Sequence, residues 1–370
     1  MRKIVFMLIL IFLIVSGCVF RSSTQERSTQ FSLGLRPLPR EFLDWWFENL
    51  DTLKNNKKIV EYYSDIAQTQ ELILSPLIDV SRIDPYDMRA LGLVTPPKDQ
   101  GSNDTCWAFA TIGSLESAML TQLGVSEISS RYPFIPFPNE PNLSEQFVAY
   151  HNKDWEVRPD PYTDGGWVLT YHETNKDLGG SAFFSMYDLI QRGAPIEEVF
   201  PYITTDYDWI RWNSTNPSWE HDRVRADKTL VIPPYDYQDF QNQDWEYYVN
   251  TIKSVLKLFG ALYVGMMVYS DFYNYWNNWP NDGEVYLKSE YSSLVGGHAI
   301  LLVGWDNEYH DSHSSYTGPV WILKNSWGTD GGDGGYFYLP MITPDEFQKK
   351  QCPDWKIEYQ YMYVPYFESE

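Results

Sequence analysis

Residues 100–110 read QGSNDTCWAFA, and this stretch decides the fold because it places one cysteine at the start of a helical pattern. After Cys106, apolar residues recur at spacings of four, three and four, at Ala108, Ile112, Leu115 and Met119. This period predicts a helix with one buried face that ends at Gly124. A thiol at a helix N-terminus lies at the positive end of the helix dipole, which favours the reactive thiolate.

Two later segments supply partners for a nucleophilic cysteine. His298 opens an apolar run of strand length with glycines at both ends, and Asn325 ends another short apolar strand. A cysteine–histidine pair needs a third group to orient the imidazole, and an asparagine side chain does this by accepting a hydrogen bond from the ring. A lone cysteine is more often a buried structural residue, but the order Cys106, His298, Asn325 predicts nucleophilic catalysis.

These segments resemble the motifs of the papain and cathepsin family of cysteine peptidases. Gln100 to Phe109 is similar to the nucleophile segment of the family, Gly297-His298-Ala299 to its histidine segment, and Asn325-Ser326-Trp327-Gly328 to its asparagine segment. Two further short motifs of the family are matched by Leu143-Ser144-Glu145-Gln146 and by Gly179-Gly180. The resemblance covers roughly residues 80–345. It implies an α+β, papain-like two-lobed fold with a helical lobe, a β-rich lobe and an active-site cleft between them.

The resemblance implies a cysteine endopeptidase that hydrolyses peptide bonds without a metal or another cofactor. Cys106 is then the nucleophile, His298 the general acid and base, and Asn325 the group that orients His298. The Gln100 side chain and the Cys106 backbone N–H would hold the oxyanion, and the thiol pKa would fall to ~3–4. Trp327 would shield the bond between Asn325 and His298 from water.

The same resemblance implies that substrate backbone binds at Gly179, Gly180 and Gly297. Residues 330–334 (DGGDG) match a glycine-rich turn of the family, so we expect no metal there. One departure is Gly331, which replaces a second tryptophan of the family and is expected to leave the leaving-group side of the cleft more open. Side-chain specificity and the choice between endopeptidase and exopeptidase action stay open.

Residues 1–17 have the pattern of a secretory signal, with two basic residues before a short apolar run. Residues 15–18 (VSGC) further resemble a prokaryotic lipobox, in which the cysteine becomes the lipid-modified first residue. We therefore expect an exported, extracytoplasmic protein that Cys18 anchors to a prokaryotic cell membrane. An ordinary signal peptide with an incidental cysteine, or an uncleaved anchor, are the alternatives.

The remaining chain divides by composition. Residues 18–34 are polar and suit a tether, and residues 35–76 form an N-terminal extension that is either a removable pro-segment or a permanent addition. Residues 77–370 are the expected peptidase domain, helical up to residue 200 and mainly β afterwards. Because 192 residues separate Cys106 from His298, against ~130–150 in the family, we expect insertions around 150–175 and 203–244.

Several further elements are predicted from periodicity. Helices are expected within 179–193 and at 245–259, the latter ending at Gly260. Strands are expected at 262–268, 284–287, 298–305, 320–325 and 335–339.

The charge of the chain limits its partners. A net charge of −22 argues against binding to nucleic acid or to an anionic membrane through the protein surface. We expect peptide or protein substrates and a monomer. A catalytically silent surface binding or adhesion lipoprotein would be expected to lack a catalytic residue, yet Gln100, Cys106, His298 and Asn325 are all present. A transglutaminase-type enzyme would place aspartate where Asn325 stands.

Overall fold

The computed structural model describes most of the chain. The described residues are 32–55, 61–136, 140–152, 155–159, 167–171, 179–203, 222–237, 244–277, 283–314, 316–341 and 356–368. The described residues from 32 onward belong to one compact unit. The expected signal, Cys18, most of the tether and much of both expected insertions lie outside the described residues. None of the described helices combines the length and the apolar composition that crossing a bilayer requires.

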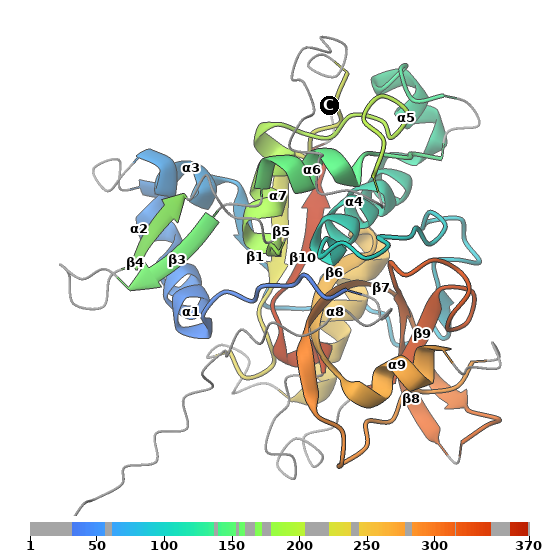
Figure 1. Cartoon of the computed structure of the whole chain (residues 1–370). Coiled ribbons are helices and arrows are strands. Elements are labelled where there is room, and N and C mark those ends of the chain that lie inside the picture. The colour runs from blue at the N-terminus through green and yellow to red at the C-terminus, as the bar shows by residue number, and fades with distance from the viewer. Residues whose placement is uncertain are drawn as a thin grey trace, which may run out of the picture. The chain divides into compact units, whose positions relative to one another are not determined.

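A large sheet forms the β-rich part of the domain (Figure 1). Its eight strands run in the order β1-β5-β10-β6-β7-β8-β9, and β2 pairs with β7. The strands are β1 (Gln70–Leu72), β2 (Tyr86–Asp87), β5 (Lys228–Ile232), β6 (Leu262–Tyr269), β7 (Leu294–His310), β8 (Thr317–Lys324), β9 (Tyr336–Pro340) and β10 (Met362–Tyr366). A separate two-stranded sheet joins β3 (Trp155–Pro159) to β4 (Trp167–Tyr171). The described elements therefore make the α+β fold that the sequence predicts.

Helices pack on this sheet and beside it. They are α1 (Arg40–Glu48), α2 (Leu50–Asn55), α3 (Glu61–Gln68), α4 (Cys106–Ala118), α5 (Gly124–Arg131), α6 (Glu145–Asn152), α7 (Ala182–Gln191), α8 (Trp245–Phe259) and α9 (Ser270–Asn277). The nucleophile helix α4 contacts β7 and β10 on the sheet and α6 and α7 among the helices. Because α4 lies between the main sheet and the helices α6 and α7, it can present Cys106 to residues of both.

The predicted elements agree with the structure except at three points. Helix α8 has the predicted bounds, and Gly260 follows it with φ +113°. The strand expected at 284–287 is wrong, since Val285 makes only a single bridge to Tyr338. The α-helical part of α4 ends at Ala118, earlier than expected, and a π-helical turn (Met119–Leu123) extends the helix to Gly124, whose φ of +72° ends it at the expected position, before α5. All residues of α4 are buried, so the expectation of one buried face is also wrong.

The N-terminal extension is built into the domain. Strand β1 pairs in parallel with β5 and so belongs to the main sheet. The ring of Trp46, on α1, lies 5.0 Å from that of Phe183 on α7, and its indole N–H donates to the Gln70 side chain at 2.8 Å. Residues 40–55 and 61–72 therefore share the core and the sheet of the peptidase domain.

We expect Trp46→Ala to lower the free energy of unfolding by about 3–5 kcal/mol, because it empties a fully buried indole site. Trp45→Ala, at the half-buried neighbouring position, is the matched control and should cost clearly less. Urea denaturation of both variants measures the difference. If both losses were below 1 kcal/mol, the extension would not unfold together with the domain.

Candidate active site

Cys106 is the first residue of α4 and is fully buried. Its sulfur accepts backbone N–H groups from Ala299, at 3.4 Å, and from Gly34, at 3.2 Å. Ala299 directly follows His298 in β7, so the β-rich part brings the histidine segment to the nucleophile. Gly34 comes from the N-terminal part of the chain, which the sequence did not place at this site.

His298 lies in the middle of the paired part of β7, opposite Met266 of β6. Its Nε2 is 2.7 Å from the Oδ1 atom of Asn325, which comes directly after β8. With Nε2 engaged, Nδ1 is the ring nitrogen that has no hydrogen-bond partner among the described residues. The imidazole therefore has one nitrogen held by Asn325 and one available for proton transfer.

Aromatic rings enclose this histidine–asparagine pair. The Trp327 ring stacks on the His298 ring, with centroids 4.6 Å apart and planes 28° from parallel. Trp276 of α9 packs edge-on against Trp327 at 5.5 Å and is buried. A side chain at Gly331 would collide with the Trp276 indole, so that indole occupies the space expected to be open there. The prediction of a more open leaving-group side at Gly331 is corrected accordingly.

Gln100 is fully buried, and every polar atom of its side chain is engaged. Its Oε1 accepts the hydroxyl of Ser326 at 2.6 Å, and its Nε2 donates to the backbone carbonyls of Asn103, at 2.8 Å, and Ser32, at 3.0 Å. In a flipped amide, Oε1 would face two carbonyl oxygens, so this network favours the orientation with the amide N–H groups toward Ser32. The amide can thus offer a hydrogen bond to a carbonyl oxygen that takes the place of Ser32.

Residues 32–36, which we call the strap, lie across the nucleophile. Gly34 O accepts the Gly180 N–H at 3.0 Å, and the Arg36 N–H donates to Gly180 O at 2.9 Å. On the other side, the Leu35 N–H donates to Gly297 O at 3.2 Å. Two of the three glycines predicted to bind substrate backbone therefore bind the backbone of the chain itself. At the third, Gly179, a side chain would collide with the Arg36 side chain.

Burial changes the expected ionisation of the catalytic pair. Burial raises the pKa of the Cys106 thiol to about 11 and lowers that of His298 to about 4. The sequence predicts a thiolate and an imidazolium, but with the strap in place the neutral thiol and the neutral imidazole are favoured near pH 7. The reason is desolvation, which penalises both charged forms and outweighs the backbone hydrogen bonds to sulfur.

We expect the contribution of His298 to the free energy of unfolding to fall as the pH drops from 6.5 to 4. The unfolded chain protonates His298 near the ordinary pKa of 6.5, whereas the folded chain does so only near 4. The unfolded state thus binds more protons in this interval, which costs about 3 kcal/mol in full. Urea unfolding at several pH values should show a less unfavourable change on acidification in His298→Gln than in the wild type, whereas His151, Glu145 and Asp188 contribute equally in both proteins. An unchanged pH dependence in that variant would contradict the assignment.

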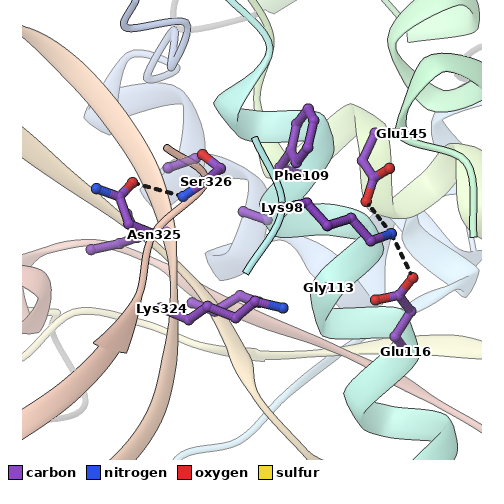
Figure 2. Close-up of a pocket in the computed structure, with 12 residues that line it drawn as sticks. Lys98, Phe109, Gly113, Glu116, Glu145, Lys324, Asn325 and Ser326 are labelled. Carbon is purple, nitrogen blue, oxygen red and sulfur yellow. Dashed lines mark hydrogen bonds and ion pairs between the residues drawn. The ribbon is translucent and has the colours of Figure 1, made fainter. Parts of the chain in front are cut away.

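A buried charge cluster lies next to these residues (Figure 2). Lys98 Nζ bonds to the carboxylates of Glu116, at 2.9 Å, and Glu145, at 2.6 Å. Lys324, directly before Asn325, reaches the Thr95 hydroxyl at 3.2 Å, and burial lowers its pKa to about 8. A cavity of about 20 Å³, roughly the room for one water, lies between these groups.

This cluster connects the segments that carry the catalytic residues. Glu116 lies on α4 with Cys106, and Lys98 lies two residues before Gln100. Lys324 ends β8 directly before Asn325. Buried carboxylates need compensating partners, so the ion pair between Lys98 and Glu116 favours a fixed arrangement of their two segments. The Thr95 hydroxyl, which bonds to both Glu116 and Lys324, connects the end of β8 to them.

Several residues of the site escaped the sequence analysis. The strap, Trp276 and the hydroxyl of Ser326 all act through contacts between distant parts of the chain. Ser326 was visible as part of the asparagine motif, but its bond to Gln100 spans 226 positions. Of the predicted site residues, the structure brings Gln100, Cys106, Gly179, Gly180, Gly297, His298, Asn325 and Trp327 together, while Cys18 lies outside the described residues.

The sequence of the chain is similar to that of one known protein family. Residues 83–131 and 172–353 match the model of the papain family cysteine proteases. A viral cathepsin of Choristoneura fumiferana defective polyhedrosis virus is 31% identical over 253 residues, which cover 68% of this chain and 57% of the relative. Falcipain-3 of Plasmodium falciparum is 26% identical over 272 residues, 72% of this chain and 42% of its own length. The chain thus spans between 42% and 57% of the length of these two relatives.

A solved structure is similar at lower identity. The digestive procathepsin L2 proteinase from the larval midgut of Tenebrio molitor is 21% identical to this chain, with a TM-score of 0.49. The alignment covers 78% of this chain and 70% of the other.

Proposed function

The chain belongs to the papain family of cysteine proteases, and from this premise we propose that it is a cysteine endopeptidase with Cys106 as its nucleophile. The observation that carries the proposal is the bond of 2.7 Å between His298 and Asn325, next to a sulfur that the residue after His298 contacts. A nucleophile, a base and a group that orients the base are the elements that this chemistry requires.

In the proposed mechanism, the Cys106 thiol gives its proton to Nδ1 of His298 when the substrate replaces the strap. The sulfur attacks the scissile carbonyl carbon, and the oxyanion receives hydrogen bonds from the Gln100 amide and the Cys106 backbone N–H. His298 then protonates the leaving amine, and the C–N bond breaks to leave a thioester. Water, deprotonated by His298, attacks the thioester and releases the carboxylate product and the thiol.

The position of Cys106 supports this use of the thiol. As the first residue of α4, it lies where backbone N–H groups have no intrahelical partner and where the helix dipole stabilises negative charge. Without the strap, the desolvation that now raises the thiol pKa would decrease, and an imidazolium at His298 would favour the thiolate.

We propose peptides or proteins as substrates, bound through their backbone. Gly180 and Gly297 support this, because Gly180 donates one backbone hydrogen bond to Gly34 and accepts one from Arg36, and Gly297 accepts one from Leu35. Such bonds hold an extended peptide without regard to its side chains. We propose no metal and no cofactor in the reaction, since the thiol, imidazole and amides supply every proton and charge that the steps need.

The organisation of the N-terminus belongs to the proposal as well. We propose that residues 1–17 are a signal, that Cys18 carries a lipid and that the tether holds a monomeric domain outside the cytoplasm of a prokaryotic cell. The expected end of the tether at residue 34 is corrected to residue 31, because Ser32 and Gly34 bind at the active site. We also propose insertions around 150–175 and 203–244. The break in the family match between residues 131 and 172 supports the first insertion.

The test of the proposed function is peptide hydrolysis by a protein from which the strap has been cut. Incubation with a mixed peptide library, followed by mass spectrometry of the products, should reveal internal cleavage that an epoxysuccinyl inhibitor blocks. Cleavage that persists with the inhibitor, or no cleavage although Cys106 reacts with the inhibitor, would contradict the endopeptidase proposal.

A further inference from the structure

We propose that a cavity beside the catalytic site receives one substrate side chain, and that Arg40 of α1 and Asp236 select tyrosine there over phenylalanine and leucine. This cavity, which we call the α1 cavity, has a volume of about 370 Å³ and is lined by residues of α1, the start of α7, β6 and the segment 359–363. The inference names the substrate class of the site and rests on the proposed function.

The α1 cavity borders the catalytic site through β6. Alternate residues of a strand share one face, and three such residues of β6 line the cavity: Tyr263, Gly265 and Met267. Gly265 pairs with Ala299, whose backbone nitrogen lies 3.4 Å from the Cys106 sulfur. A substrate side chain in the cavity therefore belongs to a residue close to the scissile bond.

The side chain of Leu35 marks the entrance. Its Cδ2 atom would lie only 2.8 Å from a Cβ atom at position 265, so Gly265 makes room for it. The Leu35 N–H donates to Gly297 O, and a substrate residue that takes over this bond places its side chain at the same entrance. With Leu35 in place, about 370 Å³ stays open behind it, which is within the usual range of ligand sites. A side chain longer than leucine can therefore reach further into the cavity.

Aromatic rings form much of the wall. They belong to Phe183 on α7, Tyr263 on β6, Tyr363 on β10, and Tyr359 and Tyr361 directly before β10. An incoming aromatic ring can pack edge-on or offset against such rings, which adds to the free energy gained when its area is buried. The wall thus favours an aromatic side chain over leucine.

One ion pair makes this aromatic wall polar at one point. Arg40 and Asp236 are the charged residues among those that line the cavity; they lie 3.1 Å apart, and their side chains are 33% and 45% exposed. Asp44, at 2.6 Å from Nε, and the Tyr361 ring, at 5.5 Å from the guanidinium carbon, fix the position of Arg40. Because a guanidinium has five N–H groups, a tyrosine hydroxyl can accept one that the two aspartates leave, and it can donate to Asp236.

The other side-chain types fit this wall less well. The charges of Arg40 and Asp236 cancel, so a charged substrate side chain would lose its hydration without a net attraction. Phenylalanine and leucine have no group that bonds to the ion pair. Tyrosine combines an aromatic ring with a hydroxyl that both donates and accepts, and it therefore matches the wall best.

Membership of the family does not imply this selection. The family match covers residues 83–131 and 172–353, whereas Arg40 precedes these ranges and the segment 359–363 follows them. Helix α1 is fixed on the domain, because its Trp46 packs on Phe183 with ring centroids 5.0 Å apart. The α1 wall is therefore a feature of this chain and a stable part of its fold.

The first test needs no catalysis and uses position 35 of the full-length chain as the probe. Urea unfolding gives the folding equilibrium constants of Leu35→Tyr and Leu35→Phe, and the ratio of the two should fall roughly fivefold when Arg40→Met is added, the scale of one lost hydrogen bond. Arg82→Met, at an exposed position outside the cavity, is the matched control and should leave the ratio unchanged. The same ratio with and without Arg40 would overturn the proposal.

The second test measures the selection on substrates. The protein from which the strap has been cut receives peptides that differ at one of the three residues before the scissile bond, which is tyrosine, phenylalanine or leucine. At one of these positions, kcat/KM for tyrosine should exceed that for phenylalanine roughly fivefold and that for leucine roughly tenfold. Arg40→Met should remove the preference for tyrosine over phenylalanine and retain that for phenylalanine over leucine. Equal kcat/KM for tyrosine and phenylalanine at all three positions would contradict the proposal.

These readouts separate this inference from the proposed function. If the stability ratio depends on Arg40 as expected but no peptide is hydrolysed, the selectivity of the α1 cavity is established and the peptidase proposal fails. If peptides are hydrolysed without any preference for tyrosine over phenylalanine, the peptidase proposal stands and the inference about the α1 cavity is wrong.

Discussion

Cys106→Ala is expected to lower peptide hydrolysis by the cut enzyme by roughly 10⁵-fold or more, which is the scale of loss when a catalytic nucleophile is removed elsewhere. The reason is that no other group of the described site can form the covalent intermediate, so the two-step route through the thioester is lost. Initial rates with a cleaved peptide from the library measure the effect.

The controls for this prediction address the fold and the other thiols. The variant should keep the unfolding midpoint of the wild type, because alanine fills most of the space of the thiol at the start of α4. Cys352→Ala, which removes a thiol without an assigned role, should hydrolyse peptides like the wild type. Residual activity of Cys106→Ala above 1% of the wild type, an order-of-magnitude threshold far above the loss expected for a nucleophile, would exclude Cys106 from that role.

Gln100→Ala is expected to lower kcat by roughly 10²–10³-fold and to leave KM nearly unchanged. The amide of Gln100 would gain strength only when the carbonyl oxygen becomes negative, so its loss affects the transition state more than the bound substrate. Steady-state kinetics of the cut enzyme separate the two parameters.

Two further variants show whether Gln100 acts as a donor. Ser326→Ala removes the hydroxyl that holds Oε1 of Gln100, and it should lower kcat by a smaller factor in the same direction. Gln68→Ala, at an exposed position of α3, is the matched control and should have no effect. A rise in KM without a fall in kcat for Gln100→Ala would mean that Gln100 only binds substrate.

The residues of the catalytic constellation were predictable because they sit in short motifs whose spacing and residue types reflect the chemistry. Cys106 begins a helix, and His298 and Asn325 lie in or directly after strands with continuous apolar runs. Helix α8 was also predicted to its ends, because an apolar stripe and Gly260 both mark it. These signals are local, so the sequence alone carries them.

The features that the sequence did not reveal depend on contacts between distant segments. The strap uses backbone atoms of Gly34, Leu35 and Arg36, and backbone hydrogen bonds leave no residue pattern. Helix α4 is buried on all sides, so its sequence has no polar face that would mark where the α-helix changes to the π-helical turn after Ala118. Trp276, on helix α9, fills the space beside Gly331. The glycine at position 331 alone could not reveal that this space is filled.

The open question about residues 35–76 shows the same limit. Composition allowed either a removable pro-segment or a permanent extension, because both need apolar helices that pack on the domain. The structure distinguishes two parts within this stretch: residues up to 36 contact the catalytic site, and residues 40–55 and 61–72 share the core and the sheet. No sequence pattern marks the boundary other than the two prolines at Pro37 and Pro39.

The central claim is that Cys106 becomes an activated thiolate through His298 once the strap has left. The pH dependence of its alkylation by iodoacetamide in the cut protein, followed at Cys106 by mass spectrometry, tests this most directly. We expect an alkylation rate that is already high at pH 6 and changes little up to neutral pH in the wild type, and that is low at pH 6 in His298→Ala. A rate that rises only near the ordinary cysteine pKa of ~8.5, in both the wild type and the variant, would contradict it.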